Sequence, residues 1–143
     1  MPSLFLAAVA REEGFGIPGG RATRNNNPGD INYGSFSIAH GADRIENPPL
    51  NRAQPRFAHF PTAEVGFAAM KALFQVPGKF VYIPATETEP ASRHLVAGYA
   101  GATVREALYR YAPPADSNDT SSYEANVCKW VGCKPTDIID TLL

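Results

Sequence analysis

Two adjacent acids, Glu12 and Glu13, are the residues of this sequence best suited to acid–base chemistry. They end a helix predicted over residues 3–13 and are followed by Gly14 and Phe15. A carboxylate at a helix C-terminus faces the negative end of the helix dipole, and an apolar neighbour removes water from it. Both effects favour the protonated acid that a proton donor requires near neutral pH. Taken alone, however, the stretch fits better with two solvated charges at an ordinary helix end.

Glycine, proline and asparagine dominate the segment after this helix, which we therefore predict to be irregular over residues 14–34. It contains the triplet Asn25, Asn26 and Asn27, whose amides can both donate and accept hydrogen bonds. Such amides either fix tight backbone turns or bind polar ligands such as sugars. The triplet by itself favours the structural role.

The composition indicates one folded domain over residues 1–143. Apolar residues make up 44% of the chain and charged residues 19%, so a sizeable core can form. The net charge of -1 gives no electrostatic support for binding nucleic acid.

Two cysteines, Cys128 and Cys133, with three histidines make a poor zinc site, and no feature calls for a metal or an organic cofactor. A local disulfide between the cysteines is conceivable but not implied.

The apolar run over residues 4–10 resembles a signal peptide only superficially. No Lys or Arg precedes the run, and cleavage after Ala10 would remove the helix that leads to Glu13. We predict a buried first helix capped by Ser3 instead. No other segment approaches the length of a membrane span, so we expect no membrane insertion.

The remaining pattern predicts a mostly helical α+β fold with a small β-hairpin region after the first helix. The hairpin strands are expected within residues 31–39 and 56–60, joined by a loop over residues 40–55. Residues 80–83 either form a further strand or cover the core. Thr103 and Glu106 match a capping box at the start of one later helix. Helices are predicted over residues 62–76, 92–99, 103–111, 120–131 and 135–142.

This order of elements resembles the lysozyme-like superfamily, and four sequence blocks narrow the resemblance. The chain is similar to the small lytic transglycosylases of phage virions and prophages, which are related to goose-type lysozymes and soluble lytic transglycosylases. The blocks are AREEGF at residues 10–15, RNNNPG at 24–29, FAHFPTAEVGF at 57–67, and YAPP at 111–114 with NDT at 118–120 and Tyr123. Each block is modestly specific, and four in order across most of the chain are a strong signal.

The resemblance implies a lysozyme-like fold and cleavage of the β-1,4 bond between N-acetylmuramic acid and N-acetylglucosamine in peptidoglycan. It selects Glu13 as the catalytic acid, because the acid directly before Gly-Phe recurs in the narrower group; the broader transglycosylase pattern would select Glu12. A lytic transglycosylase needs one such glutamate. The glutamate donates a proton to the leaving oxygen and then removes one from the muramoyl C6 hydroxyl, which closes a 1,6-anhydro ring.

One position departs from the family pattern, since the group usually has Asn where this chain has Asp30. Asp30 is either a turn residue or a second acid that activates water, which would make the enzyme a hydrolytic muramidase. Asp43, Glu46 and Glu64 are weaker candidates for that base. An alternative from a different class is a virion structural or glycan-binding module that has lost catalysis.

The resemblance also implies supporting residues and a location. Arg24, Asn25, Asn26, Asn27 and Tyr123 are expected to hold the acid loop or to contact the substrate. The expected partners are peptidoglycan glycan strands, together with a virion or secretion apparatus. With no signal peptide apparent, the resemblance implies a protein of a phage virion or prophage that acts in the periplasm or cell wall.

Overall fold

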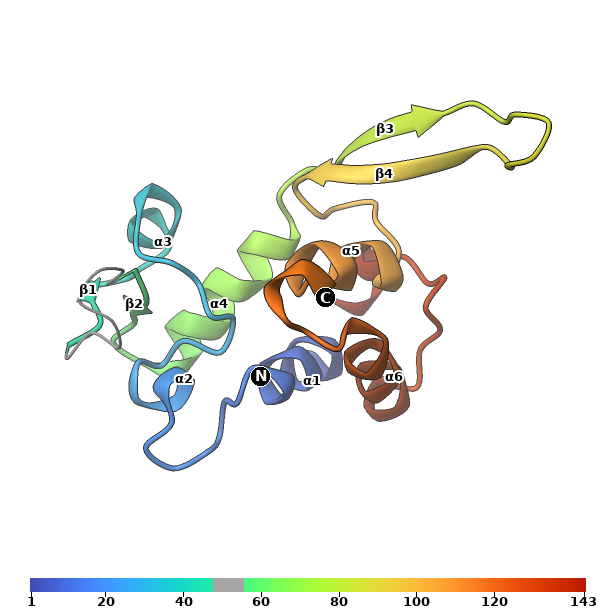
Figure 1. Ribbon diagram of the computed structural model, residues 1–143. Coiled ribbons are helices and arrows are strands. Elements are labelled where there is room, and N and C mark those ends of the chain that lie inside the picture. Colours follow the sequence, from blue (N-terminus) through green and yellow to red (C-terminus); the bar gives the residue numbers. More distant parts are fainter. Residues whose placement is uncertain (48–55) are drawn as a thin grey trace. The chain divides into compact units, whose positions relative to one another are not determined.

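A computed structural model describes residues 1–47 and 56–143 of the chain (Figure 1). The chain divides into two compact units, Met1–Ala72 and Leu73–Leu143. The described residues form helices and two small antiparallel sheets of two strands each, which confirms the predicted α+β class. The single domain expected over residues 1–143 stays a prediction. None of the described helices combines the length and the apolar character needed to cross a membrane.

The first unit begins with helix α1 (Leu4–Glu12), whose two ends are as predicted. Ser3 caps the start, because its Oγ accepts a hydrogen bond from the Leu6 amide at 3.2 Å. Gly14 follows the C-cap residue Glu13 and has a φ of 83°, a left-handed conformation that favours glycine. The helix buries its apolar face, so Glu13 is held at a fixed helix end.

Two predictions about the next segment are wrong. The segment predicted to be irregular contains the short helix α2 (Arg21–Arg24), and much of the strand predicted over residues 31–39 is helix α3 (Ser35–Ala39). Ser37 explains the second difference. Its buried hydroxyl accepts a hydrogen bond from the Gly34 amide at 2.9 Å and donates to the Gly34 carbonyl, which closes the first helical turn.

The first sheet differs in part from the predicted hairpin. Strand β2 (Ala58–His59) lies where the second strand was predicted, but it pairs with β1 (Arg44–Ile45), which lies in the predicted loop. Residues 31–33 do run beside β2, because Asn32 forms an antiparallel bridge with Phe57. Part of the predicted loop, residues 48–55, lies outside the described residues.

Helix α4 (Ala63–Phe74) follows and is close to the predicted helix over residues 62–76. Thr62 caps it by accepting a hydrogen bond from the Val65 amide at 3.2 Å. Gly66 is required on this helix, because a Cβ there would lie 2.0 Å from the Asn26 carbonyl oxygen. The missing side chain lets α4 lie directly against the asparagine triplet.

The second unit carries a β-hairpin of strands β3 (Lys79–Ile83) and β4 (Ser92–Ala97) (Figure 1). Of the two alternatives left open for residues 80–83, the strand is the one observed, whereas the helix predicted over residues 92–99 is wrong. Side chains of β4 alternate between half-buried and exposed, as a strand requires. The Arg93 guanidinium lies 4.1 Å from the centre of the Phe80 ring, a contact across the two strands that a helix would not make.

Helices α5 (Val104–Tyr111) and α6 (Thr120–Val131) confirm two further predictions. Both bonds of the predicted capping box are present between Thr103 and Glu106. The last predicted helix, over residues 135–142, is reduced to a 3-10 turn at Ile139–Leu142.

Cys128 and Cys133 are free thiols at the end of α6, with their sulfur atoms 3.6 Å apart. Burial, followed by the hydrogen bond shared with Cys133, raises the pKa of the Cys128 thiol to about 12. The reactive thiolate is therefore disfavoured at neutral pH.

Candidate active site

The first unit brings two of the predicted acids, Glu13 and Asp30, together. A hydrogen bond joins their carboxyl groups, although the two residues lie at opposite ends of the loop. Two carboxylates in direct contact repel each other strongly when both are ionised, so the favoured state of such a pair holds one proton. The sequence singled out both residues, but it did not predict that they touch.

This contact changes the acidity of the pair. Burial raises the pKa of the Asp30 carboxyl to about 9, and the hydrogen bond and the charge of Glu13 act in the same direction. The positive charge of Arg21 opposes them. Because the two groups titrate together, the proton belongs to the pair rather than to one oxygen. The pair therefore keeps a transferable proton across the neutral range.

Backbone geometry holds the two acids in place. Glu13 caps α1, and its amide donates to the Val9 carbonyl at 3.1 Å. Asp30 ends the turn after Pro28 and Gly29 with a φ of 48°, a left-handed conformation that Asp and Asn tolerate better than most side chains. An asparagine would fit the same backbone.

The side chains of Asn26 and Asn27 form hydrogen bonds with backbone groups of the same unit. The Asn27 side chain is fully buried, and its Nδ2 donates to the carbonyls of Ile31 and Ala58, each at 2.9 Å. The Asn27 Oδ1 accepts from the Ile31 amide at 2.9 Å. Asn26 donates to the Phe60 carbonyl at 2.9 Å. These bonds tie the loop to β2 and to the chain after it, so they favour the structural role for both residues.

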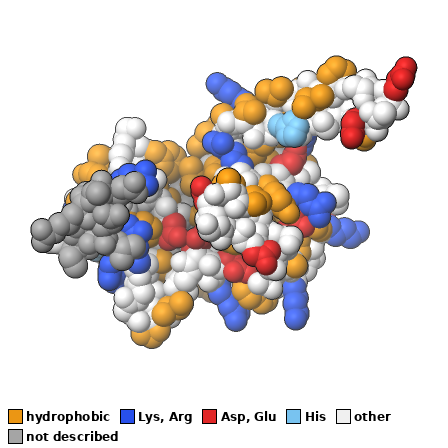
Figure 2. Space-filling model, in the orientation of Figure 1, with side chains coloured by type: hydrophobic (Ala, Val, Ile, Leu, Met, Phe, Trp, Pro, Cys, Tyr) orange, Lys and Arg blue, Asp and Glu red, His pale blue; other side chains and the backbone are white. Residues whose placement is uncertain are grey.

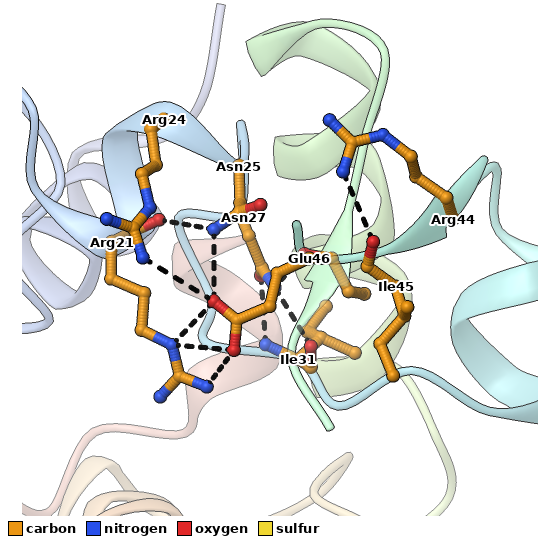
Figure 3. A network of polar contacts seen from close by, with 9 residues as sticks. Arg21, Arg24, Asn25, Asn27, Ile31, Arg44, Ile45 and Glu46 are labelled. Carbon is orange, nitrogen blue, oxygen red and sulfur yellow. Dashed lines mark hydrogen bonds and ion pairs between the residues drawn. The ribbon is translucent and has the colours of Figure 1, made fainter. Parts of the chain in front are cut away.

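Asn25 belongs to an ionic cluster around the buried Glu46 that includes Arg21 and Arg24, shown in Figure 3. The Glu46 side chain is 1% exposed. Arg21 binds its carboxylate through Nε, at 3.1 and 2.9 Å from the two oxygens, and through Nη2. Arg24 approaches the same carboxylate at 3.8 Å, and the Asn25 Nδ2 at 3.5 Å. Glu46 is thus the buried partner of two arginines.

Arg21 is the residue of this region that sequence reasoning missed. It pairs with Glu46, its guanidinium lies 4.2 Å from the centre of the Phe57 ring, and its charge acts on Asp30. Nothing in the sequence distinguishes it from Arg24, because the partner of both, Glu46, follows more than twenty residues later.

Two other candidate acids, Asp43 and Glu64, belong to the first unit, whereas Tyr123 belongs to the second. Asp43 is exposed and bonds the His59 Nδ1 at 2.6 Å. Glu64 is in the first turn of α4. Tyr123 is a buried residue of α6 in the second unit, so its contact with substrate beside Glu13 stays a prediction.

The described residues include no group of three or more His, Cys, Asp or Glu side chains placed to bind a metal ion. Comparison with protein-family models, with curated proteins and with solved structures found no match for this chain. The chemistry of the site therefore has to be argued from the acid pair and its surroundings.

We expect Asp30→Asn to stabilise the folded protein above neutral pH. In the folded protein the pair of Asp30 and Glu13 keeps a proton up to about pH 9, whereas the unfolded Asp30 releases its proton near pH 3.8. The free energy of unfolding therefore falls as the pH rises through this window, and asparagine removes that fall. At pH 8 the gain should raise Tm by roughly 2–4 °C for each 1 kcal/mol recovered.

Thermal unfolding at pH 5 and pH 8, followed by circular dichroism, measures this effect. The Tm of Asp30→Asn should change less between the two pH values than that of the wild type. Asp116→Asn is the control, because Asp116 is an exposed residue of the second unit. An Asp30→Asn protein with the wild-type dependence of Tm on pH would show that Asp30 is ionised in the folded state.

Proposed function

We propose that this chain is a lytic transglycosylase of lysozyme-like fold that cleaves the bond between N-acetylmuramic acid and N-acetylglucosamine in peptidoglycan. The observation that carries the proposal is the hydrogen-bonded carboxyl pair of Glu13 and Asp30 at the end of α1. The four sequence blocks described above supply the substrate class, and Glu13 stands in the first of them.

The reaction needs one proton that is first given and then recovered. The pair donates its proton to the glycosidic oxygen as the bond breaks and positive charge develops at the muramoyl C1. The ionised pair then accepts the proton of the muramoyl C6 hydroxyl, whose oxygen bonds to C1 and closes the 1,6-anhydro ring. The carboxyl pair then holds one proton again, as at the start, and the reaction consumes no water.

The contact between the carboxyl groups favours this route over hydrolysis. Inverting glycosidases keep their two carboxyl groups roughly 6.5–9.5 Å apart to admit a water, and retaining ones about 5–5.5 Å apart. Groups that share a hydrogen bond are closer than either arrangement. A pair with one shared proton suits an acid that later becomes a base, whereas an Asp30 that activates water would first have to separate from Glu13.

Analysis of the products tests the proposal. Purified peptidoglycan is digested with the protein, and the released muropeptides are weighed by mass spectrometry. We expect products that end in 1,6-anhydromuramic acid and are lighter by one water than the reducing-end products. Reducing-end products would identify a muramidase and make Asp30 its candidate base. Binding to peptidoglycan without any release would indicate a glycan-binding module.

The proposal also places the protein at the cell wall, where a phage virion or a prophage-encoded release system would deliver it. Its partners would be peptidoglycan glycan strands and the apparatus that carries it there. The resemblance carries this part of the proposal, and detection of the protein in purified virions would test it.

A further inference from the structure

The second unit contains a pocket that the proposed reaction does not use. It has a volume of about 310 Å³ and is lined by residues of β4 and α5. We call it the basic pocket, because its lining includes Arg93, Arg105 and Arg110 with a single acid, Glu106. Figure 2 shows basic side chains, in blue, where the β3–β4 hairpin meets the rest of its unit.

Two of the three arginines are neutralised by acids of the same unit. Arg93 binds Glu106 through two bonds, from Nε at 2.9 Å and from Nη2 at 2.7 Å. Arg105 binds Glu124 in the same way, with both distances 2.9 Å. These bidentate pairs fix both side chains but leave little net charge on either.

Arg110 differs from the other two. Its Nε donates to the Gly98 carbonyl at 3.1 Å and its Nη1 to the Val96 carbonyl at 3.3 Å. Its guanidinium also lies 5.3 Å from the centre of the Tyr99 ring. No carboxylate among the described residues forms an ion pair with it. The basic pocket therefore has a net positive charge that comes from Arg110.

The contacts of Arg110 also hold it in position before any ligand arrives. An arginine already fixed by two carbonyls and an aromatic ring loses less conformational freedom when it binds. A pocket of this size accommodates a small ligand or one end of a larger one. Tyr109, another residue of the lining, is 39% exposed and adds a hydroxyl group and a ring face.

We propose that the basic pocket binds a terminal oxyanion, the carboxylate or phosphate group of a ligand, with Arg110 as its principal cation. The planar guanidinium matches both groups in charge and in hydrogen-bonding geometry. A group of low charge is favoured, because Arg110 is the one arginine of the lining without a carboxylate partner among the described residues. The proposal is independent of the acid pair and would hold in an inactive protein.

Titration of the isotope-labelled protein with inorganic phosphate and, separately, with acetate tests the inference by NMR at constant ionic strength. We expect saturable shifts of the α5 amides and of the arginine side-chain signals with at least one anion. Stronger binding of phosphate would indicate a phosphorylated ligand, and stronger binding of acetate a carboxylate ligand such as the end of a peptide.

Two variants show whether Arg110 is responsible. Arg110→Gln should weaken binding by about tenfold, since a charge-assisted hydrogen bond is lost. Arg110→Lys keeps the charge without the planar geometry and should bind with intermediate affinity, which also reports whether the fold survives substitution. Arg44→Gln, an exposed arginine of the first unit, is the matched control and should bind like the wild type. Non-saturable shifts, or equal losses in Arg110→Gln and Arg44→Gln, would overturn the proposal.

Discussion

Glu13→Gln should reduce the rate of peptidoglycan cleavage by about 10²- to 10⁴-fold, the contribution expected of a general acid and base. The substituted amide has nearly the size of the carboxyl group and can still hydrogen-bond to Asp30, so the fold of the loop should be preserved. It cannot, however, deliver a proton to the leaving oxygen and recover one from the C6 hydroxyl. The initial rate of muropeptide release from purified peptidoglycan measures the loss.

Glu12→Gln is the matched control, because it removes the same charge from the adjacent residue, the last of α1. It should retain most of the wild-type rate. The opposite pattern, with activity lost in Glu12→Gln and kept in Glu13→Gln, would transfer the catalytic role to Glu12. Sedimentation of both variants with insoluble peptidoglycan separates a loss of chemistry from a loss of binding.

Helices whose ends carry their own signals were predictable from the sequence. Ser3 and Gly14 define the two ends of α1 through a side-chain cap and a left-handed glycine, and both signals lie within the segment itself. The capping box of Thr103 and Glu106 defines the start of α5 in the same local way. The end of α1 also determines where Glu13 stands, so this part of the candidate site followed from the sequence.

Elements whose conformation depends on contacts with residues far away in the sequence were not predictable in this way. β4 has residues that a helix would accept, but pairing with β3 and the contact of Arg93 with Phe80 make it a strand. The site shows the same limit. Asp30 is identifiable as an acid in a turn, yet its contact with Glu13 and the action of Arg21 on it depend on how the whole loop folds back.

Arg21→Met should destabilise the protein by about 3 kcal/mol, the lower end of the loss expected when the partner of a buried charge is removed, because Glu46 is 1% exposed but Arg21 is 34% exposed. Methionine retains apolar contact with the Phe57 ring but leaves the buried Glu46 carboxylate without its bidentate partner. Arg24 at 3.8 Å and Asn25 at 3.5 Å compensate only in part. Urea unfolding should show a lower midpoint with an unchanged slope.

Two further variants separate the lost ion pair from lost packing. Arg24→Met removes a more exposed arginine from the same carboxylate, with 41% of its side chain exposed, and should cost less than about 1 kcal/mol. Adding Glu46→Leu to Arg21→Met removes the buried charge that has lost its bidentate partner and should recover much of the lost stability. If Arg21→Met were as mild as Arg24→Met, or if the double variant were no more stable than Arg21→Met alone, the pair would not anchor this loop.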